Sequence, residues 1–258
     1  MSIRALRDQS VIIGTLMLRE IITRYGRRGL GFLWLVAEPL IFTFGVLFIW
    51  SIIRPPYSHG VALAPFVLTG YMGLLFFRHL ITYSMGAITG NAGLLYHQTI
   101  KLLHLYSARY VLEFLGSTFA FAIGYAILVW FGQMELPHDI LLIYWGWFCL
   151  FVFGVGLALV LSALALEFEV LQRLIPVMIY AILPFSGVFI MAEWVPESYR
   201  DIYLAIPMPH TIEMVRAGVL GEFVATHYDP LYPFFWGGVL IAFGLVLLAR
   251  AKSHIDAE

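Results

Sequence analysis

The sequence predicts an all-α membrane protein with six transmembrane helices, an amphipathic interface helix before the first of them, and short re-entrant helices before the last. Of the 258 residues, 61% are hydrophobic and 12% are charged, whereas soluble domains carry about 25% charged residues. The apolar residues gather in runs of about 20, the length that a helix needs to cross a bilayer. These runs cover residues 34–53, 61–81, 110–131, 140–166, 174–191 and 234–249.

The residues before the first apolar run fit an amphipathic helix. Its apolar face carries Leu18, Ile21, Ile22 and Tyr25. Its opposite face is polar and carries Glu20, Thr23, Arg24 and Arg27. Such a helix lies in the membrane interface, and its basic side faces lipid headgroups or a cytoplasmic partner. We expect this interface helix to include the charged residues Arg19, Glu20, Arg24, Arg27 and Arg28. The simpler alternative is a basic flank that only fixes the topology.

Lysine and arginine are distributed unequally between the two sides of a six-span chain. The side with both termini carries 12 of the 15, and the other side carries Arg54, Arg200 and Arg216. Because cytoplasmic segments are enriched in these residues, both termini are predicted to be cytoplasmic. The chain then divides into an N-terminal cytoplasmic segment with the interface helix at 1–33, a transmembrane domain at 34–250, and a cytoplasmic tail at 251–258.

Glu38 is a carboxylate inside the first apolar run, directly before Pro39. Charged groups are costly within a bilayer and usually face protein or water. One interpretation places Glu38 and Pro39 in the first turn of the span, at the interface. The other pairs Glu38 with an arginine of the interface helix. The sequence alone does not separate them.

The outer loop before the last run is about 40 residues long, yet it has helical character. Pro207 and Pro209 bracket a helix start, where proline is tolerated. We therefore predict short amphipathic or re-entrant helices in this loop, buried against protein. Pro176 and Pro184 interrupt the run before it, and they should kink or shorten that helix.

Catalytic motifs are missing from the sequence. A phosphate-binding loop needs lysine after glycine, but the only lysines, Lys101 and Lys252, do not follow glycine. His210 and Glu213 do not match the zinc motif H-E-x-x-H, and Cys149 is the single cysteine. We predict no catalytic residue, no metal site and no cofactor in this chain. An intramembrane enzyme that modifies glycans or lipids, acting through His210 or Glu213, is the less favoured alternative.

Four segments together resemble the ABC-2 family of transporter permeases, and within it the KpsM-type subunits. The segments are LREIITRYGRRGLGFLWLVAEPL at 18–40, SMGAITGNAGLLYHQTIK at 84–101, SARYVLE at 107–113 and IPMPHTIEMVRAGVL at 206–220. The resemblance implies a half-channel that pairs with a second copy of itself and with a separate KpsT-like ATPase, which binds ATP and Mg. It also implies that a cytoplasmic coupling element docks on that ATPase. By position, this element contains Asn91, Leu94, Leu95, Tyr96, His97 and Lys101.

The resemblance further implies ATP-driven export of a lipid-linked capsular polysaccharide across the bacterial inner membrane. KpsE-like and KpsD-like periplasmic and outer-membrane components would be further partners, and nucleic acid would not be one. An O-antigen or teichoic acid exporter has the same architecture and stays open as an alternative. Residues placed where gating or the glycan path is expected are Trp34, Glu38, His210, Glu213 and Arg216.

Overall fold

The computed structural model describes residues 3–25, 31–55, 57–58, 60–87, 91, 100–221 and 224–255. Its α-helices are α1 (Ile3–Tyr25), α2 (Gly31–Ile53), α3 (Leu63–Met85), α5 (Leu102–Trp130), α6 (Ile140–Glu167), α7 (Glu169–Ile182), α8 (Glu197–Leu204), α9 (Pro207–Leu220) and α10 (Tyr232–Ile255). Two short 3-10 helices are η2 (Leu183–Phe185) and η3 (Ala192–Trp194). The strands β1 (Tyr57–Ser58) and β2 (Val61–Ala62) form a small antiparallel hairpin.

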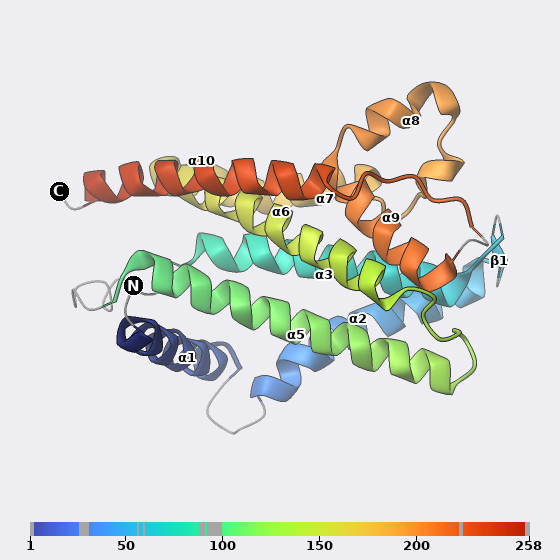
Figure 1. Ribbon diagram of the computed structural model, residues 1–258, viewed down its shortest axis with the longest axis horizontal. Helices are drawn as coiled ribbons and strands as arrows, with labels where there is room; N and C mark the ends of the chain where they lie inside the picture. Colours follow the sequence, from blue (N-terminus) through green and yellow to red (C-terminus); the bar gives the residue numbers. More distant parts are fainter. Residues whose placement is uncertain are drawn as a thin grey trace.

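The five long helices α2, α3, α5, α6 and α10 run side by side (Figure 1). Both chain termini lie at one end of this bundle, which we call the inner end. The hairpin lies at the opposite end, which we call the outer end. Helix α1 is not parallel to the long helices, and it packs against the first turns of α5 at the inner end (Figure 1).

Five of the described helices are long and apolar enough to cross a membrane. Their membrane-spanning parts are Leu33–Ile53, Leu63–Met85, Leu102–Trp130, Ile140–Glu167 and Tyr232–Ala251. The run predicted at 174–191 corresponds to a shorter apolar stretch, Val170–Phe185. Helix α7 ends at Ile182, and Pro184 opens the 3-10 turn that follows. The all-α membrane fold is confirmed, but six full-length spans are not.

Helix α3 lies at the centre of the bundle, and α2 lies at its edge. In α3, 94% of the most apolar window is buried, against 11% for α2 and 22% for α10. The exposed apolar side chains of α2 include Ile41, Phe48 and Ile52. The central position of α3 allows α2, α5, α6, α7 and α9 all to contact it.

Helices α6 and α10 pack through glycines. A Cβ at Gly156 would lie 2.7 Å from the carbonyl oxygen of Gly237, and a Cβ at Gly237 would lie 2.7 Å from the backbone nitrogen of Phe153. Only glycine lets the two backbones approach this closely, a device typical of helices packed in membranes. This contact joins the last span to the bundle along most of its length.

Helix α9 inserts between α3 and α6 from the outer end. Its first half reaches α3, where a Cβ at Gly73 would meet Ile212. Its last turn lies beside the start of α6, because the amide of Asp139 donates to the carbonyl of Gly218 at 2.9 Å. Pro207 occupies the first turn of α9, as predicted. The short helices expected before the last span are therefore confirmed as α8 and α9.

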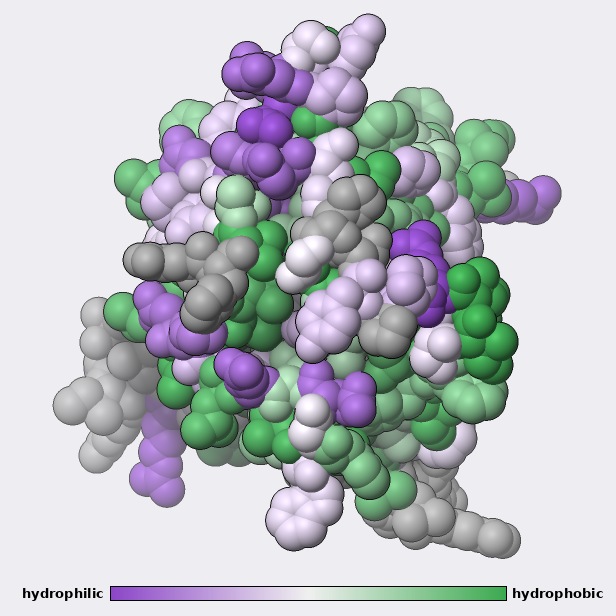
Figure 2. Space-filling view, turned by 90° about the vertical axis from the view of Figure 1, so that its right-hand side faces the viewer, coloured by the Kyte–Doolittle hydropathy of each residue, from purple (hydrophilic) through white to green (hydrophobic). Residues whose placement is uncertain are grey.

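Helix α8 projects from the bundle at the outer end (Figure 1). Figure 2 looks onto this end, and hydrophilic side chains gather at the top of the view, where α8 lies. Glu197 and Asp201 are exposed on α8, and Tyr203 is buried beneath it. The hydroxyl of Tyr203 donates to the carbonyl of Ile190 at 3.0 Å, which ties α8 to the segment that follows α7.

Candidate functional site

Helix α1 turns its polar face towards the bundle. The Glu20 and Arg24 side chains are 14% and 12% exposed, whereas Leu18 and Ile22 are 64% and 49% exposed. The sequence predicts that this polar face turns towards lipid headgroups or a cytoplasmic partner. For Glu20 and Arg24 that prediction is wrong, because α5 and α3 supply charged and aromatic groups that pair with them. The exposed apolar face remains available to lipid, as expected of an interface helix.

Six ionisable side chains from four helices meet beneath α1, and we call them the inner cluster. Its members are Glu20, Arg24, Glu38, His79, Arg109 and Glu113. The Nε atom of Arg24 lies 2.9 Å from Glu20 Oε1, and its Nη1 atom donates to Glu113 Oε1. The Nε atom of Arg109 lies 3.0 Å from the same Glu20 oxygen. Glu20 and Glu113 thus connect α1 to α5.

His79 extends this cluster from α5 to α2. Its Nδ1 atom lies 3.6 Å from Glu113 Oε2, and its Nε2 atom lies 3.8 Å from Glu38 Oε1. Tyr83, one turn further along α3, lies beneath Arg24, whose Cζ atom is 3.7 Å from the ring centroid. A cation over an aromatic face is a favourable contact, and more so away from water.

Arg24 shows the balance of forces in this cluster. Burial alone would lower the pKa of Arg24, but the nearby carboxylates of Glu113 and Glu20 outweigh burial and raise that pKa. Arg24 therefore stays charged although little of it touches water. Buried ion pairs of this kind are kept only where their geometry and hydrogen bonds are good.

A groove runs along the bundle between α2, α3 and α7. Its inner part is a cavity of about 180 Å³ that includes Glu38, His79 and Tyr180. Its next part is a cavity of about 250 Å³ that includes Phe42 and Tyr71. Arg78 lines both parts, and its Nη1 atom donates to the Tyr180 hydroxyl at 3.1 Å. The inner cluster therefore reaches the groove through Glu38 and His79.

Aromatic rings line the outer part of the groove. Tyr71 packs edge-on against Trp50 and Phe189, with ring centroids 5.6 and 5.7 Å apart. This row of aromatic rings continues outward through the stacked rings of Trp50, Phe66 and Trp194. Such faces suit the apolar sides of sugar rings, and a hydroxyl such as that of Tyr180 suits their polar edges.

Arg216 and Glu213 on α9 form a second charged site, which with His210 we call the outer cluster. Both side chains are fully buried, and Arg216 Nη1 lies 3.7 Å from Glu213 Oε1. Arg216 donates to the carbonyls of Gly187 and Val188 at 2.5 and 3.0 Å. Glu213 accepts from the backbone amide of Ala192 at 3.3 Å.

The outer cluster holds the irregular segment between η2 and η3. Gly187 has φ of 84°, a left-handed conformation that favours glycine. Gly70 on α3 leaves room for this arrangement, because a Cβ there would lie 3.0 Å from Arg216 Nη2. His210 adds a further tie: its Nδ1 accepts from the Asp229 amide at 2.8 Å and its Nε2 contacts the Leu204 carbonyl at 2.6 Å.

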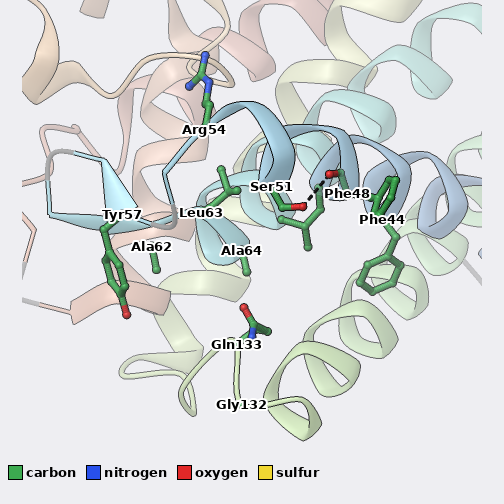
Figure 3. Close-up of a pocket in the computed structure, with 11 residues that line it drawn as sticks. Phe44, Phe48, Ser51, Arg54, Tyr57, Ala62, Leu63, Ala64, Gly132 and Gln133 are labelled. Atoms are coloured by element: carbon green, nitrogen blue, oxygen red, sulfur yellow. Dashed lines mark hydrogen bonds between the residues drawn. The ribbon is translucent and has the colours of Figure 1, made fainter.

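A wider cavity of about 550 Å³ lies at the outer end, between α2, the hairpin and the turn after α5 (Figure 3). Its apolar wall is formed by Phe44, Leu47 and Phe48. Arg54 points away from the other labelled side chains, and its guanidinium lies 3.9 Å from the Trp50 ring centroid. The Ser51 hydroxyl donates to Phe48 of its own helix at 2.7 Å. We place the candidate path in the groove instead, because the groove combines aromatic rings with the Arg78–Tyr180 pair.

The first interpretation of Glu38 is wrong, and of the second the structure excludes a pair with Arg24. Helix α2 begins at Gly31, so Glu38 and Pro39 lie about two turns inside it rather than in the first turn. Among the described residues, the ion pair of Glu38 is with His79 of α3, whereas Arg24 bonds Glu20 and Glu113. His79, which had no role in the sequence analysis, contacts Glu38 where the second interpretation placed an arginine.

The predicted coupling element is described only in part. Asn91 is buried, and its amide oxygen accepts from Arg19 of α1 at 2.7 Å. Lys101 is exposed and caps α5, because its backbone amide donates to His104 Nδ1 at 3.2 Å. Leu94, Leu95, Tyr96 and His97 lie outside the described residues, as do Arg27 and Arg28. Trp34, expected near the path, is half exposed on α2.

Three residues of the inner cluster were missed by sequence reasoning: His79, Arg109 and Glu113. The signal for two of them is present in the segment SARYVLE, where Arg109 and Glu113 stand four residues apart on one helical face. Glu113 also falls inside the predicted span at 110–131, where a carboxylate is costly. The helix starts at Leu102 instead, eight residues earlier than predicted, so both residues lie in its inner half.

Metal chemistry has no geometric basis in the described part of the chain, where no group of three or more His, Cys, Asp or Glu side chains could hold an ion. The two charged clusters are occupied with pairing helices and holding backbone. The groove offers aromatic faces, hydroxyls and Arg78, together with Glu38 and His79 of the inner cluster.

The sequence profile described as ABC-2 type transporter matches residues 12–220. The chain belongs to the ABC-2 type transporter family. It is 35% identical to the capsule polysaccharide export inner-membrane protein CtrC of Neisseria meningitidis serogroup B, over 98% of this chain and 96% of that protein. It is 32% identical to the capsule polysaccharide export inner-membrane protein BexB of Haemophilus influenzae, over 99% and 96%. The polysialic acid transport protein KpsM of Escherichia coli is 26% identical over 93% of each chain. As a member of this family the chain is a transport subunit.

Proposed function

We propose that this chain is the permease subunit of an ATP-driven exporter of lipid-linked capsular polysaccharide in the bacterial inner membrane. The observation that carries the proposal is the similarity to capsule export proteins of two species over nearly the whole length of both chains. The match to the ABC-2 family supports a transport function. The names of the relatives, which are capsule polysaccharide export proteins, support polysaccharide as the transported substrate.

The groove is the part of the chain that we assign to the glycan. Its aromatic rings provide faces for sugar rings, and the Arg78–Tyr180 pair provides a cation and a hydroxyl at its inner part. An arginine suits a carboxylate or a phosphate of the substrate, because its planar fork can donate two parallel hydrogen bonds. The groove is open along α2 and α7, so a second copy of the chain would close it into a channel.

ATP would be bound outside this chain. Neither lysine stands in a phosphate-binding loop, so a separate ATPase subunit with its Mg is proposed as the energy source. With both termini in the cytoplasm, the inner end would face that ATPase. The segment around residues 91–101 would dock on it, and α1 would carry its movement through the inner cluster to α5, α3 and α2.

The test is complementation of a capsule-forming strain that lacks its own permease. The gene for this chain is supplied with its cognate ATPase, and surface polysaccharide is measured alongside glycan retained in the cytoplasm. We expect export with the active ATPase and retention with an ATPase that cannot hydrolyse ATP. Export without any ATPase, or a purified chain that modifies glycan alone, contradicts the proposal.

Two groove variants locate the path. Arg78→Gln removes the charge and Tyr180→Phe removes the hydroxyl, and each should lower export several-fold while the protein still reaches the membrane. Arg54→Gln is the matched control, since Arg54 is an exposed outer arginine on Trp50. Equal loss in all three variants would remove the assignment of the groove. The chemical nature of the retained polymer separates capsule from O-antigen or teichoic acid.

A further inference from the structure

The inner cluster contains more carboxylates than permanent cations. Two of its three carboxylates, Glu20 and Glu113, contact the guanidiniums of Arg24 and Arg109 within 4 Å. The third, Glu38, contacts only His79 among the described residues. His79 is the remaining member, and it contacts two of the carboxylates. With neutral imidazole the cluster carries one net negative charge, and with imidazolium it carries none. An uncompensated charge is strongly unfavourable at a buried site.

The geometry around His79 distinguishes these two states. Each ring nitrogen faces a carboxylate oxygen, Nδ1 towards Glu113 and Nε2 towards Glu38. A neutral imidazole donates from one nitrogen only, so the lone pair on the other would point at an anion. An imidazolium presents a positively charged N–H to both carboxylates, at ion-pair distances of 3.6 and 3.8 Å. His79 is 6% exposed and Glu113 is 1% exposed, so water does little to screen the contact between these two side chains.

Among the residues that the structure describes, the other charged or titratable groups around His79 contact groups other than its two carboxylates or already share them. Arg24 already contacts Glu20 and Glu113, and Arg78 lines the same cavity but bonds the Tyr180 hydroxyl. Arg19 bonds Asn91. The phenol of Tyr83 lies next to the imidazole, with ring centroids 5.2 Å apart. Within the described residues, His79 is the side chain placed to balance both carboxylates.

We propose that His79 carries a proton on both nitrogens and acts as a positioning residue, its charge linking the interface helix to the wall of the groove. The link runs from Arg24 on α1 through Glu113 on α5 and His79 on α3 to Glu38 on α2. The Glu38 side chain is 37% exposed, and it lines the groove. These contacts transmit a displacement of Glu38 at the groove wall to α1. This consequence for transport rests on the proposed function, whereas the charge state of His79 does not.

The proposal is tested by removing the charge of His79 and then removing the charge of Glu38 to restore the balance. The full chain is purified in detergent, and thermal unfolding is followed for wild type, His79→Gln, Glu38→Gln and the double variant. His79→Gln leaves the cluster with a net negative charge, and we expect a fall in Tm of roughly 5 °C or more. Adding Glu38→Gln removes one carboxylate and should recover at least half of that fall. If Glu38→Gln instead adds to the loss, His79 is a neutral hydrogen-bonding residue and the proposal is overturned.

A second variant separates charge from shape. His79→Lys fits the site less well than glutamine but retains a positive charge, so it should be the more stable of the two single variants. His104→Gln is the matched control, because His104 is a partly exposed histidine that caps α5. If His79→Gln does not accumulate in membranes, recovery of the protein by Glu38→Gln gives the same answer. Absence of recovery counts against the proposal.

The positioning role of His79 is tested by measuring how well α1 docks on α5. Leu16 of α1 packs with Leu105 of α5, so cysteines at these positions, in a Cys149→Ala background, report docking through their crosslinking yield. We expect His79→Gln to lower the yield at least twofold and the double variant to restore it. An unchanged yield would refute the positioning role. If crosslinking and stability follow the prediction but no variant, nor wild type, exports polymer with its ATPase, the proposed function fails and the inference stands.

Discussion

The inner and outer clusters are both buried groups of charged residues, yet they join different things. The inner cluster joins side chains of four helices that are far apart in the sequence, such as Arg24 and Glu113. The outer cluster joins two side chains of one helix, Glu213 and Arg216, largely to backbone amides and carbonyls of neighbouring loops. The inner cluster connects helices to one another, whereas the outer cluster fixes non-helical segments of backbone.

The difference follows from what each region needs. Non-helical backbone within a membrane protein must find hydrogen bonds inside the protein, and Arg216 supplies donors to two consecutive carbonyls. At the inner end the helices already satisfy their own backbone, so charged side chains are free to connect one helix to another. We therefore expect variants of the outer cluster to affect stability most and variants of the inner cluster to affect coupling most.

The largest effect is expected from Arg216→Met. It leaves Glu213 as an unpaired buried charge and two carbonyls without donors, which should cost about 3–5 kcal/mol of unfolding free energy. Thermal unfolding in detergent and the amount of protein in the membrane measure the loss. The double variant Arg216→Met with Glu213→Leu should lose less than the single one. A harmless single variant would remove the distinction between the clusters.

A smaller loss of stability is expected from Glu113→Gln, about 1–3 kcal/mol, because Arg24 retains Glu20 as a partner. The variant should also reduce export, since α1 then keeps only the Glu20–Arg109 pair as a charged contact with α5. Protease accessibility of α1 in membrane vesicles and export in the complementation strain are measured together. Glu113→Asp is the control that retains the charge. Export that falls only in proportion to the amount of folded protein would contradict a coupling role.

Pairwise coupling tests the path through the inner cluster. Double-mutant cycles on unfolding free energy should give a coupling of about 0.5–3 kcal/mol between Arg24→Gln and Glu113→Gln, which are in contact. The coupling between Arg24→Gln and Glu38→Gln should be smaller, because Glu113 and His79 lie between them. The reverse order would restore the direct pairing of Glu38 with the interface helix.

Much of the fold was predictable from composition and periodicity. Apolar runs located five long helices, and Pro207 located the start of α9, because both signals are local. The third helix was predicted eight residues too short. The polar residues of its first two turns, including Arg109, look like loop when read alone. In the structure Arg109 pairs with Glu20 of α1, and Leu105 packs with Leu16, which are tertiary contacts that the local sequence does not reveal.

The site was less predictable than the fold. Glu20 and Arg24 were correctly grouped, but the side that they face was not, since an amphipathic pattern does not say whether charges face water or an internal charged surface. His79 stands alone in the sequence, and its two carboxylates come from residues 41 positions before it and 34 positions after it. Only the packing of α2 and α5 on α3 brings them together.

The smallest effect is expected from Glu193→Gln, on the exposed rim of the outer cluster. His227 Nε2 contacts Glu193 Oε2 at 2.6 Å, and this hydrogen bond lowers the pKa of Glu193. A carboxyl with a lowered pKa stabilises the folded state above its unfolded pKa and loses that contribution as the pH falls through the folded value. The variant should therefore be slightly less stable than wild type at neutral pH, where the Glu193 carboxylate contributes, and should converge on wild type as the pH falls. His227 also donates its backbone amide to Glu213 at 3.3 Å, which Glu193→Gln leaves in place. A large loss at neutral pH would mean that the surface pair, rather than the buried backbone contacts, holds the loop, and the contrast between the two clusters would need another cause.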